Sequence, residues 1–180
     1  DQAHEHGWDA GADPVGEAEV LVDFWFTHFN VSAEKGKARW LLPSYERDAI
    51  RPYVLGRFRD LLQAASLHPA MLFYLDNYLN TVPRRVGNRV TGGINENQGR
   101  ELLELHTVGV DAGYSQADVY EASRCLTGHG IDNLNTSGAY VFRAANHDNE
   151  AKQVFGLSVP AGGGEGDVQR LFDHLASHPA

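Results

Sequence analysis

The sequence predicts a mainly α-helical fold, an orthogonal helical bundle with a small β-hairpin insertion near residues 139–156. Two observations favour helices. Apolar side chains recur at a spacing of three and four residues over most of the chain, and proline or glycine separates these stretches. A third observation favours the insertion, because β-branched and aromatic residues gather in two short runs, 139–143 and 152–155, on either side of a turn-like stretch.

Size and composition are those of one globular domain. A chain of 180 residues with 42% hydrophobic and 22% charged residues can bury a core of its own. The formal net charge of −9 argues against a nucleic-acid partner and against anionic lipid, since both require a basic surface. No apolar run reaches the roughly 20 residues that span a membrane. The single cysteine, Cys125, excludes an intramolecular disulfide, and we expect it in the core.

The chain begins with a segment that lacks helical periodicity. Residues 1–15 are rich in glycine and aspartate, so we expect a flexible N-terminal arm followed by a single helical domain over residues 16–180. The first helix starts near Gly16. One of its faces carries apolar residues and a histidine at helical spacing: Leu21, Phe24, Trp25 and His28.

Prolines divide the next helical stretch. Ser44 follows Pro43 as a predicted N-cap, and Pro52 divides the helix that begins there. Another helix is expected over residues 53–65. His68-Pro69 ends it and starts a further helix, since proline suits the first helical position. That helix is expected to place four residues on one face: Leu72, Leu75, Asp76 and Leu79.

Residues 81–93 form a predicted glycine- and arginine-rich loop, and loops of that length are often functional or mobile. A helix follows, capped by Asn95 or Asn97 and ended by Gly109. Ser115 and Asp118 then make a capping box for a helix that runs to Gly128. The last predicted helix spans residues 167–177. The helix after residue 95 has one face with Gly99, Leu102, Leu103 and His106.

Three polar residues share predicted helix faces with leucines or aromatic residues: His28, Asp76 and His106. Burying an unpaired polar group costs roughly 1–3 kcal/mol, so each requires a partner. His28 and His106, together with Asp76 and Glu101 or Glu104, would suit Zn, Fe or Mn.

The spacing of these ligands is not that of a known metal motif. On an α-helix Glu104 and His106 lie about 200° apart, and Glu101 and His106 are similarly awkward. The alternative is that the histidines are core residues bonded to carboxylates or to the main chain.

Carboxylates on the helix after the arginine-rich loop suggest acid–base chemistry. Glu96, Glu101 and Glu104 lie on or beside it, and Glu101 and Glu104 are three residues apart. Repulsion or burial can raise the pKa of one of them, giving a general acid beside an ionised partner, as in glycoside cleavage. Asn95, Asn97 and Arg100 are candidate substrate-binding residues. Alternatively, the glutamates only favour the helix dipole, and Arg100 pairs with Glu104.

The pair His147-Asp148 falls in the turn of the predicted hairpin. As an exposed pair it can serve a cleft, with His147 binding substrate, but simple turn formation is the favoured interpretation. The sequence contains no G-x-S-x-G elbow, no phosphate-binding P-loop and no G-x-G-x-x-G fingerprint. Serine-hydrolase, nucleotide and dinucleotide sites therefore have no support.

Several runs in fixed order carry a resemblance to a known family. They are VDFWFTHFNVS at 22–32, ERDAIRPYVLGRFRDLL at 46–62, HPAMLFYLDN at 68–77, NENQGRELLELHTVGVDAGYSQADV at 95–119 and RCLTGHGI at 124–131. With the segment carrying His147-Asp148, the chain resembles the central part of the "domain of unknown function 1800" family. The resemblance implies bacterial origin, a mainly helical fold, and export, hence a secreted or periplasmic location. The family usually has tryptophan where this chain has His129.

These observations lead to three functional hypotheses. The first is an exported hydrolase acting on a polysaccharide or envelope polymer, with Glu101, Glu104, Asp76 and Glu96 as its acid–base residues. The second is a metal-dependent enzyme centred on His28 and His106, with a divalent metal as cofactor. The third is a non-catalytic module that binds a carbohydrate or small molecule, in which the polar residues are structural.

Overall fold

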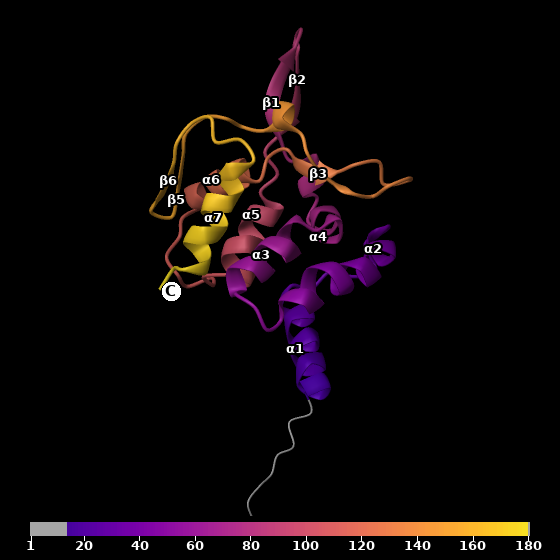
Figure 1. Ribbon diagram of the computed structural model, residues 1–180. Coiled ribbons are helices and arrows are strands. Elements are labelled where there is room, and N and C mark those ends of the chain that lie inside the picture. Colours follow the sequence, from indigo (N-terminus) through magenta and orange to yellow (C-terminus); the bar gives the residue numbers. More distant parts are fainter. Residues whose placement is uncertain (1–13, 180) are drawn as a thin grey trace, which may run out of the picture.

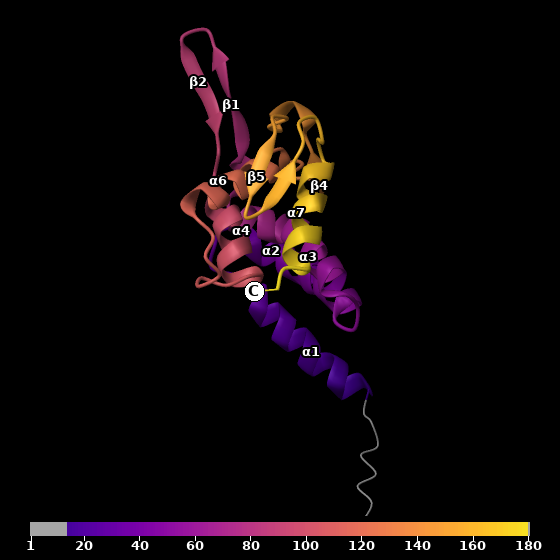
Figure 2. The same ribbon diagram turned by 90° about the vertical axis from the view of Figure 1, so that its left-hand side faces the viewer.

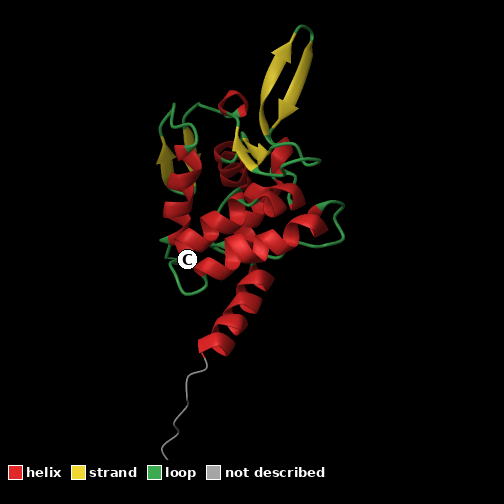
Figure 3. Cartoon of the chain, turned by 45° about the vertical axis from the view of Figure 1, so that its right-hand side comes forward, coloured by secondary structure: helices red, strands yellow, loops and turns green. Residues whose placement is uncertain are grey.

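Helices form the body of the molecule in the computed structural model, which describes residues 14–179 (Figures 1 and 3). Within those residues there are seven α-helices and three antiparallel two-stranded sheets. The prediction of a mainly helical fold is confirmed, and the orthogonal arrangement stays a prediction. Of the predicted N-terminal arm, residues 1–13 lie outside the described part, and the first helix already starts at Pro14.

The elements follow one another in a simple order. The α-helices are α1 (Pro14–His28), α2 (Ala38–Ser44), α3 (Phe58–Leu67), α4 (Pro69–Tyr74), α5 (Asn97–Glu101), α6 (Gln116–Cys125) and α7 (Gly166–Ala176). Two π-helical turns span Tyr45–Ile50 and Leu102–His106, and 3₁₀ turns span Arg51–Tyr53, Asn77–Leu79 and Ala144–Asn146. The strands are β1 (Thr81–Val86), β2 (Arg89–Gly93), β3 (His129–Ile131), β4 (Tyr140–Phe142), β5 (Lys152–Val154) and β6 (Leu157–Val159).

Helix boundaries follow local chemistry in some places and not in others. The capping box at the start of α6 is confirmed, with Ser115 and Asp118 bonding each other's main chain. The prediction of Ser44 as an N-cap is wrong. Ser44 is the last residue of α2, and its hydroxyl donates to the Leu41 carbonyl at 2.8 Å. The helix expected from residue 53 begins at Phe58, because a 3₁₀ turn over residues 51–53 precedes it.

The predicted hairpin over residues 139–156 is wrong, although both β-rich runs form strands. β4 pairs with β3, which precedes it, and β5 pairs with β6, which follows it, so the two runs lie in different sheets. Phe155 and Gly156 have φ of 45° and 86°, and positive φ at both central residues is what a two-residue type I′ turn requires. The chain therefore reverses directly after β5 and gives it a local partner.

The predicted loop over residues 81–93 is instead a β-hairpin, formed by β1 and β2. Val86 pairs with Arg89 across a two-residue turn, Gly87-Asn88, and Gly87 has φ of 61°. Glycine at the first central position is the requirement of a type II′ turn. This hairpin projects from one end of the body, and α1 projects from the other (Figures 1 and 2).

The core lies where α3 to α7 meet. Leu61, Leu62, Leu102, Leu103 and Phe172 are among its fully buried side chains. Cys125 is also fully buried, as predicted, and burial raises the pKa of its thiol to about 12. Within residues 14–179, no helix combines the length and apolar character that crossing a bilayer requires.

Candidate functional site

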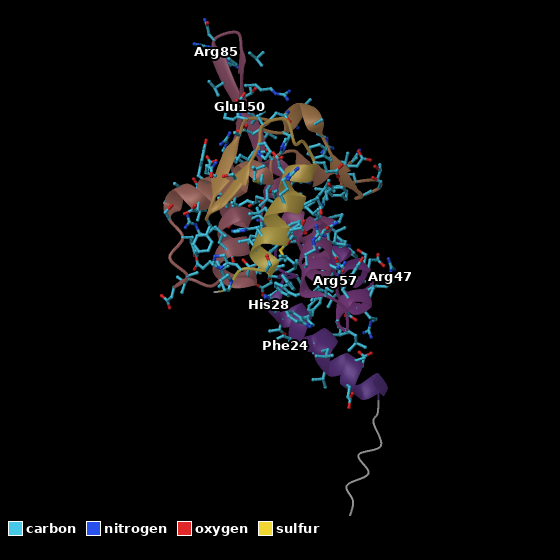
Figure 4. All side chains as sticks on the ribbon, turned by 60° about the vertical axis from the view of Figure 1, so that its left-hand side comes forward. Phe24, His28, Arg47, Arg57, Arg85 and Glu150 are labelled. Atoms are coloured by element: carbon cyan, nitrogen blue, oxygen red, sulfur yellow. The ribbon has the colours of Figure 1, made fainter. Side chains whose placement is uncertain are left out.

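A cavity of about 260 Å³ opens where the end of α1, the end of α4 and the π-helical turn after α5 meet. His28, the last residue of α1, is labelled at that end of the helix in Figure 4. Polar and apolar residues share the lining: Thr27, His28, Asn30, Met71, Tyr74, Leu75, Glu101, Leu105 and His106. Three of the predicted site residues, His28, Glu101 and His106, thus come together.

The π-helical turn explains why Glu101 and His106 line the same cavity. In a regular α-helix two residues five apart diverge by about 140°. Directly after Glu101, residues Leu102–His106 adopt the wider π form, in which hydrogen bonds join residues five apart and the angle between side chains five apart is smaller. Glu101 and His106 thus line one cavity, while the expectation that the two are awkwardly placed to bind one metal stays a prediction. Single π-helical turns occur frequently at functional sites.

The Glu101 carboxyl is half-buried and makes no hydrogen bond or ion pair with any residue of the described chain. Its pKa is raised above the ordinary value, first by burial and then by the charge of Glu104, while Arg100 acts in the opposite direction. A carboxyl group with these surroundings holds its proton to higher pH than an exposed glutamate does.

The His106 imidazole is only 5% exposed, and burial followed by the nearby His28 lowers its pKa to about 4. It is therefore neutral at physiological pH, with one donor and one acceptor nitrogen. Neither nitrogen has a hydrogen-bond partner among residues 14–179, and the ring packs with its centroid 5.1 Å from that of Phe29. A ligand in the cavity could therefore form hydrogen bonds with both the Glu101 carboxyl group and the His106 imidazole, because neither is bonded to another described residue.

His28 has a main-chain partner. Its Nε2 lies 3.2 Å from the His106 carbonyl oxygen, and since a carbonyl only accepts, Nε2 carries the proton. In the neutral ring Nδ1 is then the free acceptor. The ring centroids of His28 and His106 are 6.2 Å apart. His28 therefore fits the predicted alternative of a histidine bonded to the main chain, whereas His106 does not.

Glu104 lies on the same π-helical turn but does not line the cavity. Its charge raises the pKa of Glu101 and contributes, after burial, to raising that of Tyr114. The predicted pair of Arg100 with Glu104 is wrong. Arg100 instead contacts Glu96 at 3.3 Å and Gln116 at 2.8 Å. Glu104 can therefore influence the cavity only through its charge.

The other candidate residues near the start of α5 do not line the cavity: Asn95, Glu96 and Asn97. Glu96 accepts from Gln116 Nε2 at 2.5 Å as well as from Arg100. The Asn95 side chain accepts from the main-chain amide of Asn97 at 3.0 Å, and Asn97 donates to the Leu75 carbonyl at 3.2 Å. Because Leu75 lines the cavity, Asn97 supports one wall of it.

Asp76 is not on an apolar helix face, so that prediction is wrong. α4 ends at Tyr74, and Asp76 follows with φ of 59°, in the left-handed region that non-glycine residues rarely adopt. Its side chain is 34% exposed and pairs with Lys35 at 2.6 Å. Lys35 also donates to the Tyr74 carbonyl at 2.5 Å, so the pair fixes the chain beside the cavity.

The pair His147-Asp148 is buried, which corrects the expectation of an exposed turn. His147 lies between the Thr127 carbonyl, 2.8 Å from Nδ1, and Asp167, 3.1 Å from Nε2. Asp148 pairs with Arg124 at 2.7 Å. In this network Arg124 belongs to α6 and Asp167 to α7, and neither helix contributes a residue to the cavity.

Sequence reasoning missed the centre of that network. The Lys152 ammonium lies 2.6 Å from the Asp167 carboxylate, and both side chains are 0% exposed. Lys152 also donates to the carbonyls of Asp148 and Glu150, at 2.6 and 2.9 Å. No local pattern marks this pair, because its two members come from β5 and α7 and meet only in the folded chain.

His129, at the position where the family usually has tryptophan, is also buried. Its Nδ1 lies 2.9 Å from the Tyr140 hydroxyl, which donates to Glu165 at 2.8 Å. Burial lowers the pKa of His129 to about 3, so the ring is neutral. Its position is filled by a hydrogen-bonded imidazole, and it takes no part in the cavity.

Comparison with known proteins adds one finding. A family model with the description "Protein of unknown function (DUF1800)" matches residues 8–180. No curated protein and no solved structure matches the chain.

Proposed function

The chain belongs to the DUF1800 family, whose description names no activity, and for this member we propose an acid–base hydrolase that acts on a polysaccharide or another envelope polymer. One observation carries the proposal. A carboxyl group with a raised pKa, Glu101, and a neutral imidazole, His106, line one cavity, and neither is bonded to a described residue. Both groups are therefore available to a ligand that enters the cavity.

The two groups have complementary roles in hydrolysis. Glu101 in its protonated form would donate to the oxygen of the leaving group as the bond from carbon to that oxygen breaks. A water molecule would supply the new bond to carbon, and His106 or the free Nδ1 of His28 would accept its proton. Glu104 would keep the pKa of Glu101 high without contacting the substrate. Of the four carboxylates predicted as acid–base residues, only Glu101 is assigned that role here. Asp76 holds Lys35 beside the cavity, and Glu96 bonds Arg100 and Gln116 at the start of α5.

The cavity limits what part of a substrate can enter. Pockets for drug-sized ligands measure about 300–1,000 Å³, so a cavity of about 260 Å³ suits one ring-sized group of a larger molecule. A polymer would leave the rest of its length outside, across α1 and α4. Export to the periplasm or beyond, which the family resemblance implies, would bring the protein to such polymers.

The test is turnover of a panel of bacterial and plant polysaccharides by the intact chain and by Glu101→Gln. We expect the variant to lose at least about a hundredfold in kcat, the usual contribution of a general acid. Glu150→Gln is the matched control, since it removes the same charge from an exposed glutamate whose side chain makes no contact. Equal activity of Glu101→Gln on every responsive polymer would refute the proposal. Binding of a polymer without any turnover would favour a binding module.

A metal-dependent reaction at the same cavity is the second candidate. His28 and His106 both line it, and Glu101 could add a carboxylate, a donor set that suits zinc, iron or manganese. No group of three His, Cys, Asp or Glu side chains is arranged for a metal within residues 14–179, so binding would require the side chains to move. A stoichiometric metal in the purified protein that disappears in both His28→Ala and His106→Ala would favour this candidate.

A further inference from the structure

The hairpin of β1 and β2, residues 81–93, forms an arm that projects from the helical body. It carries three arginines, Arg84, Arg85 and Arg89, and no acidic residue. The whole chain has a formal charge of −9, so the remainder carries −12 once these three positive charges are set aside. None of the three arginines forms an ion pair with any residue from 14 to 179. The arm is therefore a separate basic element on an acidic protein.

The arm projects into solvent and has little support from the body (Figure 2). Arg85 lies near its tip, far from the body, in Figure 4. Val86 and Val90 are 64% and 70% exposed. An isolated two-stranded hairpin is only marginally stable in water, so a partner that contacts the arm would stabilise it.

The register distributes the arginines over both faces of the arm. Arg84 pairs with Thr91 and Val86 with Arg89, so Arg84 and Arg89 share one face. Arg85 pairs with Val90 on the opposite face. A flat, rigid partner would contact only one face and leave charge on the other unmatched. A flexible linear polymer can contact both.

We propose that the arm binds an acidic polysaccharide, a linear polymer that carries carboxylates. The planar guanidinium fork matches a carboxylate in a bidentate contact, which favours this ligand for arginine. A bilayer or a nucleic-acid duplex would bring a broad anionic surface against the acidic body, whereas a single polymer strand need contact only the arm. Pro83 and the register shift between Thr81 and Arg84 disfavour a peptide that adds a strand to β1.

The test is binding of polygalacturonate to the full chain, by calorimetry at low and at physiological salt. We expect binding that weakens with salt. The triple variant, Arg84→Gln with Arg85→Gln and Arg89→Gln, should bind at least about tenfold more weakly than the native chain. The matched control removes three exposed arginines elsewhere and should bind like the native chain: Arg39→Gln, Arg57→Gln and Arg170→Gln. Circular dichroism checks that both variants fold. Should the arm variant not fold, deleting residues 83–91 provides the same test.

Several results would overturn the inference. They are no binding of polygalacturonate by the native chain, equal binding by the arm variant, or tighter binding of poly-glutamate or duplex DNA than of polygalacturonate. Sedimentation that shows a dimer lost in the arm variant would instead assign the arm to a second copy of the chain. The inference does not rest on the proposed hydrolysis, because no residue of the arm lines the cavity that holds Glu101. Loss of turnover and loss of arm binding are thus separate outcomes.

Discussion

The His28 side chain donates a hydrogen bond from Nε2 to the main-chain oxygen of His106, across 3.2 Å. The bond joins the last residue of α1 to the last residue of the π-helical turn. It satisfies a carbonyl at the end of that turn, where the helical pattern leaves acceptors without partners. The same bond sets the two imidazoles beside each other at the cavity, so this contact both stabilises and shapes the candidate site.

Removing this contact should destabilise the fold measurably. His28→Ala loses the hydrogen bond and the ring contacts with Trp25 and Phe29, whose centroids lie 5.4 and 4.6 Å away. We expect the free energy of unfolding to fall by about 1–3 kcal/mol in urea denaturation. Asp23→Ala, at an exposed position of the same helix, should change it by less than about 0.5 kcal/mol. Equal effects of the two variants would contradict the role assigned to His28.

Gly99 should tolerate no larger residue, because α5 and α6 meet there. A Cβ at this position would lie 2.1 Å from Ser123 Oγ and 3.0 Å from the Val119 carbonyl oxygen. Gly99→Ala is therefore expected to cost about 1–3 kcal/mol and to lower the melting temperature. Gly166→Ala is the control, since a Cβ at Gly166 would meet nothing within 4 Å. A Gly99→Ala protein as stable as the native one would show that the two helices can separate without cost.

The buried pair of Lys152 and Asp167 should be costly to break. Lys152→Met keeps much of the side-chain volume but leaves Asp167 with His147 as its only side-chain partner among the described residues. Breaking a fully buried pair typically costs about 3–5 kcal/mol, which chemical denaturation would detect. Removing the exposed pair of Arg47 and Asp48 with Arg47→Ala should cost at most about 1 kcal/mol. A neutral effect of Lys152→Met would mean that the network adds nothing to stability.

Stability should decline as the pH falls below about 6.5. Burial lowers the pKa of His106 and His68 to about 4 and that of His129 to about 3, from the ordinary value of 6.5. Below pH 6.5 the unfolded chain binds protons at these positions while the folded chain does not, so unfolding becomes easier. The stabilisation is present above 6.5 and is lost as the pH falls toward the folded values.

Denaturation midpoints measured between pH 7 and pH 5 test this, because most carboxylates do not titrate in that window. His106→Gln should flatten the decline, since it removes one of the three groups. A slope that does not change in His106→Gln would show that folding does not lower the pKa of His106.

The charges beside Glu101 should shift its pKa in opposite directions. Glu104 raises it and Arg100 lowers it, so Glu104→Gln should move the pKa of Glu101 down and Arg100→Gln should move it up. A carboxyl resonance of Glu101 followed by NMR titration measures both. Because a raised pKa in the folded state favours the protonated form, this group stabilises the fold below the ordinary glutamate pKa. That contribution is lost as the pH rises through the folded value. Shifts of the same sign in both variants would contradict the assignment.

Local sequence patterns determined much of this protein. Apolar periodicity located α1, His68-Pro69 located the start of α4, and the Ser115–Asp118 spacing determined how α6 begins. These features depend on neighbours within one or two turns, so residue order is sufficient. The Gly87-Asn88 pair between two β-rich runs is the local signal that could have identified the arm. The burial of His106 was also predictable, since it lies among apolar neighbours along the chain.

Tertiary structure decided what those patterns left open. β4 pairs with β3, eight residues before it, and β5 takes the strand that follows its own turn, so the two β-rich runs do not pair with each other. The π-helical turn brought Glu101 and His106 to one cavity, an i→i+5 arrangement that α-helical periodicity does not predict. Lys152 and Asp167 met through the packing of β5 near α7. Lys152 and Asp167 lie in separate elements, so their proximity arises only when β5 and α7 pack in the same body, and no local spacing encodes it.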